Sequence, residues 1–131
     1  MYVLFSSLAC PDYQSLTAAY RNVDSSNNLN FGCDKRIGPG WFRFQGAAGT
    51  RMPTSCPPKY RCNTNAPGWL NGVHPTVASG EVTRKVCFHW GKSCCYFSIN
   101  IKVKNCGSFY VYYFDSTPNN GQCYLRYCGT D

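Results

Sequence analysis

The chain has 131 residues, a length that suits one domain, and it carries a formal charge of +7. Its basic residues are spread along the sequence, in pairs at most, and lack the clustered charge and recognisable motif of a nucleic-acid-binding domain. No apolar run approaches the ~20 residues needed to cross a membrane. We therefore expect no nucleic-acid partner and no membrane span.

Ten cysteines predict a disulfide framework in an oxidising, extracellular compartment, because cytosolic thiols stay reduced. The chain has no Cys-x-x-Cys and only two histidines, so neither a zinc site nor any cofactor is expected. Adjacent Cys94 and Cys95 cannot comfortably bond each other. Each should therefore reach a different partner, although the sequence alone leaves the connectivity open.

The chain begins with an apolar, strand-like segment, residues 1–9. Its alternating side chains are Tyr2, Val3, Leu4 and Phe5. A solvent-exposed apolar strand of this kind would promote aggregation. The segment should therefore pack on its own domain or on a neighbouring subunit. We interpret residues 1–9 as a candidate donor strand between subunits and residues 10–131 as the folded domain.

A short helix and then several strands are predicted along the rest of the chain. Tyr13, Leu16 and Tyr20 recur at helical spacing, which predicts a short helix that ends at Arg21. Strands are predicted at residues 41–45, 81–88, 98–104, 109–114 and 123–128, loops across residues 46–71, and a turn at residues 117–121. The predicted fold is mainly β: a small, disulfide-rich single domain with one short N-terminal helix.

Catalysis would have to use His74 and His89, with Lys92 at a phosphate, as in a small, basic ribonuclease. Nothing in their spacing makes the two histidines face each other. His74 suits a turn before Pro75, and His89 suits packing at a strand end. No Gly-x-Ser-x-Gly or His-Glu-x-x-His motif occurs, and paired cysteines leave no thiol nucleophile. We expect that the protein is not an enzyme.

Three tryptophans, Trp41, Trp69 and Trp90, are candidate glycan-stacking residues, since aromatic faces suit contact with sugar rings. The alternative is that they pack in the core or against disulfides. The basic surface similarly suits either simple solvation or attraction to acidic glycans.

Short motifs follow one another in a characteristic order over nearly the whole chain. They include Cys10-Pro-Asp-Tyr, Gly40-Trp-Phe-Arg-Phe, Gly49-Thr-Arg-Met-Pro-Thr-Ser-Cys, Arg61-Cys-Asn-Thr, Ala66-Pro-Gly-Trp-Leu-Asn-Gly, Arg84-Lys-Val-Cys, Cys94-Cys95, Val103-Lys-Asn-Cys and Tyr127-Cys128. This series resembles the cysteine-rich module of uromodulin and of the major glycoprotein of pancreatic secretory granules. All ten cysteines fall in the family order.

The resemblance implies a set of disulfides and a non-catalytic role. The implied pairs are Cys10–Cys106, Cys33–Cys123, Cys56–Cys94, Cys62–Cys128 and Cys87–Cys95. In this family, N-glycans act as lures for bacteria, but the present chain has no Asn-x-Ser/Thr sequence, so that role does not transfer.

Taken together, these features predict a secreted, non-catalytic structural or interaction module. We expect it to bind other protein subunits, first of all its own copies, and to assemble into an extracellular filament or coat. The alternative is a soluble recognition protein that binds bacterial or acidic glycans.

Overall fold

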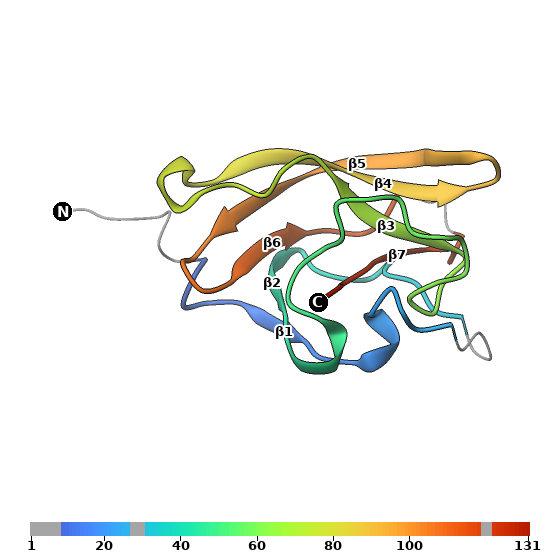
Figure 1. The fold of residues 1–131 in the computed structure, drawn as a ribbon, viewed down its shortest axis with the longest axis horizontal. Helices are drawn as coiled ribbons and strands as arrows, with labels where there is room; N and C mark the ends of the chain where they lie inside the picture. The colour runs from blue at the N-terminus through green and yellow to red at the C-terminus, as the bar shows by residue number, and fades with distance from the viewer. Residues whose placement is uncertain (1–8, 27–30, 119–121) are drawn as a thin grey trace.

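The computed structural model describes residues 9–26, 31–118 and 122–131, which build one seven-stranded sheet (Figure 1). Its strands are β1 (Gln14–Leu16), β2 (Gly40–Phe44), β3 (Ala66–Asn71), β4 (Val82–Trp90), β5 (Ser93–Asn105), β6 (Tyr110–Phe114) and β7 (Leu125–Tyr127). Their order across the sheet is β1-β2-β6-β5-β4-β3-β7. The outermost pairs, β1 with β2 and β3 with β7, are parallel, and all other pairs are antiparallel. The predicted mainly β fold is confirmed.

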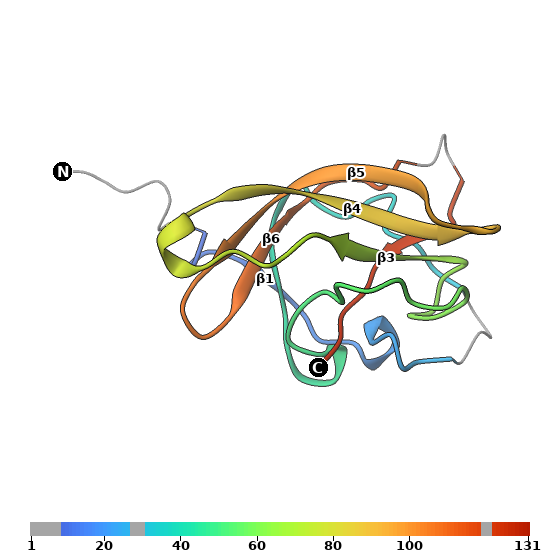
Figure 2. The same cartoon turned by 45° about the horizontal axis from the view of Figure 1, so that its top comes forward.

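The two edges of this sheet curl toward each other and meet through backbone hydrogen bonds. The amide of Val23, which follows β1, donates to the carbonyl of Gly129 at 2.9 Å, and the Gly129 amide donates to the carbonyl of Arg21 at 2.9 Å. Next in the chain, the Thr130 amide donates to the carbonyl of Arg51 at 2.7 Å. Two views show the sheet wrapping over the segment that ends at the C-terminus (Figures 1 and 2). The curled sheet therefore encloses its own core.

Aromatic rings fill that core, as expected for a chain with 10 tyrosines and 8 phenylalanines. Phe114 stacks on Tyr127 with ring centres 3.9 Å apart, and Phe88 meets Tyr127 at 5.8 Å. Phe44 packs edge-on against Tyr112 at 5.6 Å. All five side chains are almost completely buried. Each such burial stabilises the fold by about 1.5–3 kcal/mol, and favourable ring geometry adds to this.

The short helix predicted before Arg21 is not found. Gln14–Leu16 instead form β1, which pairs with β2, and only a 3-10 turn at Ala19–Arg21 follows. The helical spacing of Tyr13, Leu16 and Tyr20 was misleading, because these side chains do not share a buried face. Tyr20, for example, is 44% exposed. Backbone N–H and C=O groups of this segment form hydrogen bonds with β2 in place of the hydrogen bonds of a helix.

The prediction of loops throughout residues 46–71 is wrong at its end, where β3 lies between β4 and β7. Pro67 and Gly68 had indicated a loop. Gly68 instead permits close strand packing, because a Cβ atom there would lie 2.6 Å from the Phe88 ring. The rest of the segment is irregular apart from the 3-10 turn Gly46–Ala48.

The later predicted strands correspond to β4, β5, β6 and β7, and residues 119–121 of the predicted turn lie outside the described residues. β5 has the expected inward side chains, with Ile101 and Val103 buried. Cys87 of β4 is completely buried and forms a disulfide with Cys95 of the neighbouring strand β5.

Five disulfides cross-link this sheet, and every cysteine takes part. The pairs are Cys10–Cys106, Cys33–Cys123, Cys56–Cys94, Cys62–Cys128 and Cys87–Cys95, the same as those implied by the resemblance. Cys94 and Cys95 thus reach two different partners and join three segments at one place. Bridges that close loops as long as 96 residues restrict the unfolded chain strongly, by about 4–5 kcal/mol in the chain-entropy model.

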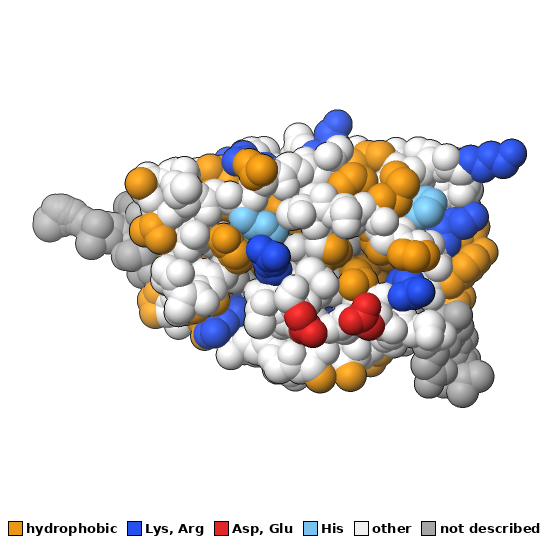
Figure 3. Space-filling model, in the orientation of Figure 1, with side chains coloured by type: hydrophobic (Ala, Val, Ile, Leu, Met, Phe, Trp, Pro, Cys, Tyr) orange, Lys and Arg blue, Asp and Glu red, His pale blue; other side chains and the backbone are white. Residues whose placement is uncertain are grey.

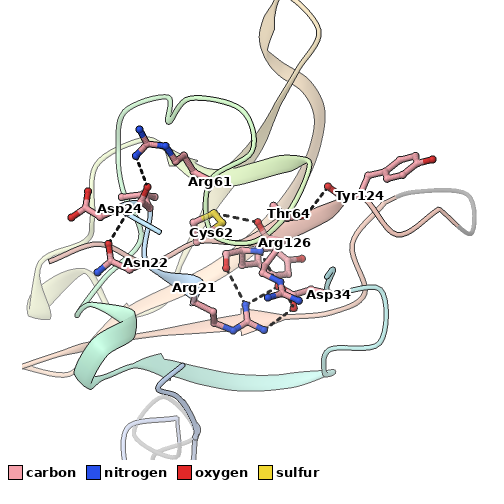
Figure 4. Close-up of a disulfide and its surroundings, with 12 residues drawn as sticks. Arg21, Asn22, Asp24, Asp34, Arg61, Cys62, Thr64, Tyr124 and Arg126 are labelled. Carbon is pink, nitrogen blue, oxygen red and sulfur yellow. Dashed lines mark hydrogen bonds and ion pairs between the residues drawn. A yellow bond between two sulfur atoms is a disulfide. The ribbon is translucent and has the colours of Figure 1, made fainter. Parts of the chain in front are cut away.

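A buried ion cluster lies beside the Cys62–Cys128 disulfide (Figure 4). The Arg21 guanidinium donates to both oxygens of Asp34, at 2.9 and 2.7 Å. The Tyr127 amide donates to the same carboxylate at 2.8 Å, and Arg21 also donates to the Tyr127 carbonyl at 3.0 Å. Asp34 therefore binds the segment after β1 to the last strand of the sheet.

Replacing Asp34 with alanine should destabilise the oxidised protein by about 3–5 kcal/mol, because it leaves buried guanidinium groups without their counter-charge. Arg21 and Arg126 are only 7% and 6% exposed. Equilibrium urea unfolding measures the effect, and Asp12→Ala, at an exposed position, is the matched control with an expected change below ~0.5 kcal/mol. Equal stabilities of the two variants would contradict the role given to Asp34.

Candidate binding site

The side chains that could do chemistry are largely held in structural contacts. No thiol is free, since every cysteine is in a disulfide. The sulfur atoms of Cys56 and Cys94 and a ring nitrogen of His89 lie within 4.8 Å of one another, as metal ligands would. The disulfide between the two sulfurs removes both thiolates, and His89 Nδ1 lies 2.7 Å from the Pro57 carbonyl oxygen, where it donates a hydrogen bond. This cluster is therefore a cross-link with a packed histidine.

His74 is bound in a second polar contact. Its Nε2 atom lies 2.8 Å from the Tyr112 hydroxyl, which also accepts the Met52 amide at 2.9 Å. Burial, followed by the charges of Arg51 and Arg84, lowers the pKa of His74 to about 4. Burial raises the pKa of the Tyr112 hydroxyl, so it stays protonated and can donate to the neutral ring. His74 and His89 form separate patches on the surface and do not face each other (Figure 3).

The three tryptophans lie on different strands, with no ring contact between any two of them in the described part of the chain. Trp41 packs edge-on against Tyr113 on the outer face, with ring centres 5.4 Å apart. Trp69 donates from Nε1 to the Cys94 carbonyl at 2.8 Å. Trp90 meets the Tyr60 ring edge-on at 5.8 Å. All three are half-buried, so each keeps one surface for a ligand but they make no shared platform.

Two adjoining hollows lie where the curled edges of the sheet meet, and both are lined by Arg51 and Asp131. One, of about 380 Å³, runs along the proline-rich segment 52–58 and includes Arg61. The other, of about 390 Å³, is lined by Thr50, Asn105, Ser108, Phe109 and Tyr110 as well. Acidic and basic side chains lie near each other in the middle of the face in Figure 3.

A second open feature is the free edge of β5. β6 pairs with β5 only over Lys102 to Asn105, whereas β4 pairs with it from Ser93 to Val103. Within the described residues, no backbone hydrogen bond reaches residues 97–100 from the β6 side. Figure 1 shows β6 ending while the β4–β5 hairpin continues as an arm. A hollow of about 420 Å³, lined by Ile99, Tyr113 and Asp115, lies at this point of divergence.

The sequence did not indicate either open feature. Arg51 and Ser108 are far apart in the chain, and they share a hollow only because the sheet curls. The length of β5 that is paired depends on where β6 diverges from it. The local sequence does not predict that point. The candidate assembly residues Tyr2, Val3, Leu4 and Phe5 lie outside the described residues.

Comparison with known proteins places the chain in a family. The model of the uromodulin-like domain family matches residues 42–129. The chain belongs to this family. It is 45% identical to the dog pancreatic secretory granule membrane major glycoprotein over 120 residues, and 40% identical to the human one. It is 42% identical to mouse uromodulin, also over 120 residues.

These alignments cover 91% of the present chain but only 18–23% of each relative. The chain thus spans about a fifth of the length of the curated relatives it matches. The five disulfides indicate an extracellular domain. Among the described residues, none of the helical segments is long or apolar enough to span a bilayer.

The His74 contact predicts a pH dependence of stability. The pKa of the ring is about 6.5 in the unfolded chain and about 4 in the folded uromodulin-like domain, so the unfolded state binds the proton first. Stability should therefore be constant above pH 6.5 and fall as the pH decreases toward 4. The loss should be about 1–2 kcal/mol, since solvent around the half-buried ring weakens the effect.

Urea unfolding of the wild type, His74→Gln and His89→Gln at a series of pH values tests this. His74→Gln should lack the loss between pH 6.5 and 4, and His89→Gln should retain it. Parallel pH curves for the wild type and His74→Gln would show that His74 does not couple protonation to folding.

Proposed function

We propose that this uromodulin-like domain is a non-catalytic, secreted interaction module that assembles with other protein subunits, first of all with its own copies. The observation that carries the proposal is the free edge of β5 at residues 97–100. An exposed strand edge presents unpaired N–H and C=O groups, which bind an added strand through main-chain hydrogen bonds.

The side chains along this edge suit such an addition. Ser98 and Asn100 are exposed, whereas Phe97 and Ile99 are half-buried on the opposite face. The hollow beside Ile99 offers space for an apolar side chain from the added strand. Main-chain pairing would supply affinity and this hollow would supply specificity.

The donor in this proposal is the apolar segment at residues 1–8. Tyr2, Val3, Leu4 and Phe5 give it the alternation of a strand with two apolar faces. The segment is anchored by Cys10, which is bonded to Cys106 just after the last residue of β5. The free edge lies in the middle of β5, about 20–30 Å from Cys106 at 3.3 Å per residue.

Donation of residues 1–8 to the free edge of the next copy would be a head-to-tail contact. A contact in which one surface binds a different surface of the next copy produces a ring if the rotation closes and a filament if it does not. A filament or extracellular coat is therefore the expected assembly. The packed histidines and the absence of a free thiol support a role without catalysis.

Deleting residues 1–8 should convert the assembly into monomers, with Ala9 retained because it is buried. Light scattering gives the mass and negative-stain microscopy the shape. On the acceptor side, Ser98→Lys with Asn100→Lys should also give monomers, because edge lysines oppose strand pairing. Thr54→Lys with Ser55→Lys, at exposed positions elsewhere, carries the same added charge and should still assemble.

A wild-type chain that is monomeric at tens of micromolar would contradict the proposal and indicate that residues 1–8 dock on their own domain. Unchanged assembly of the deletion variant would exclude residues 1–8 as the donor.

A further inference from the structure

The hollow of about 390 Å³ beside Arg51 has the size of a small-ligand site. Its lining is mostly polar and includes Arg51, Asp131, Thr50 and Ser108. Tyr110 adds an aromatic residue. A mostly polar lining suits a polar ligand, because polar groups in such a site fix the ligand's orientation.

Arg51 differs from most arginines of the domain in having a guanidinium without a partner among the described residues. Arg21 donates to Asp34, and Arg61 and Arg84 donate to the backbone carbonyls of Val23 and Val73. No ion pair or side-chain hydrogen bond within the described residues involves Arg51. Its charge is therefore available to an anion from solution.

The backbone of Arg51 is nevertheless held in place. Its amide donates to the Thr130 carbonyl at 3.2 Å, and its carbonyl accepts the Thr130 amide at 2.7 Å. The amide of the next residue, Met52, donates to the buried Tyr112 hydroxyl at 2.9 Å. The side chain thus starts from a rigid point, which reduces the ordering cost of binding.

The opposite charges of Arg51 and Asp131 indicate which class of ligand the hollow can bind. A polyanion such as nucleic acid or heparin would meet Asp131 as well as Arg51, and the carboxylate would repel it. A sugar ring with one carboxylate has an anion for Arg51 and hydroxyl donors for Asp131. Charge-assisted hydrogen bonds between a guanidinium and a carboxylate are also among the strongest available.

We propose that this hollow binds a singly acidic saccharide, a pyranose ring that carries one carboxylate. The carboxylate lies at Arg51, ring hydroxyls donate to Asp131 and bond Thr50 and Ser108, and the ring packs beside Tyr110. The site is separate from Trp41, Trp69 and Trp90, and from the β5 edge through which assembly is proposed.

Titration of the ¹⁵N-labelled domain with the methyl glycosides of N-acetylneuraminic acid and of glucuronic acid, followed by NMR, tests the proposal. Saturable shifts should centre on residues 50–51 and 107–110. Arg51→Gln should weaken binding by about tenfold to a hundredfold, the range expected for losing hydrogen bonds to a charged group. Arg36→Gln, an exposed control with the same net charge, should bind like the wild type.

Methyl glucoside, which lacks the carboxylate, should bind at least tenfold more weakly than methyl glucuronide. The proposal would be overturned if neither acid bound, if Arg51→Gln bound as the wild type does, or if the neutral sugar bound equally well. Tighter binding of a heparin fragment, weakened equally by Arg51→Gln and Arg36→Gln, would indicate attraction to net charge alone and would also overturn it.

Discussion

The buried carboxylate of Asp34 joins the segment that follows the first strand to the last strand of the sheet. It accepts two hydrogen bonds from Arg21, near the first strand, and one from the amide of Tyr127, in the last strand. Its own amide donates to the carbonyl of Leu125 at 2.8 Å. Because β1 and β7 are opposite edges of the sheet, these hydrogen bonds act together with the backbone pairing of Gly129 and Thr130 to hold the sheet in its curled form. The aromatic core and the position of the hollow beside Arg51 depend on that curl, and the free edge of β5 depends on where β6 leaves it.

The disulfides and the aromatic core give this arrangement its rigidity. Long irregular connections join the strands, and the five cross-links restrict them. In the described ranges, only 3-10 turns accompany the sheet. Binding surfaces placed on such a frame lose little conformational entropy when they bind. The free edge of β5 is part of the sheet, and the hollow beside Arg51 lies between the β5–β6 turn and the bridge from Arg51 to Thr130. A frame of this kind is well suited to binding.

Local pattern and long-range pairing explain which parts of the fold could be predicted. The alternation of Ile99, Ile101 and Val103 with polar residues identified β5, because one face of that strand is buried. β1, which has three residues, and β3, which contains Pro67 and Gly68, were missed because each pairs in parallel with a strand from a distant part of the chain. The disulfide pairs followed from resemblance to a family, since spacing alone allows many connectivities.

The candidate site was less accessible to sequence reasoning. Tryptophans stand out in a sequence as sugar-stacking residues, yet the hollow with suitable polar groups is lined by Arg51 and Ser108 instead. Their proximity depends on the tertiary fold, in which the Met52 amide, next to Arg51, donates to the Tyr112 hydroxyl in β6, the strand that follows Ser108. A contact of this kind leaves no periodic signal.

Residue-resolved amide hydrogen exchange on the dilute, oxidised monomer tests most directly whether the sheet is locked at Asp34 and open at β5. The account predicts that the Tyr127 amide exchanges only through global unfolding. Along residues 97–100 every second amide should exchange rapidly, because alternate groups of an edge strand point away from its single neighbour. Uniform protection of residues 97–100, or rapid exchange at Tyr127, would contradict it.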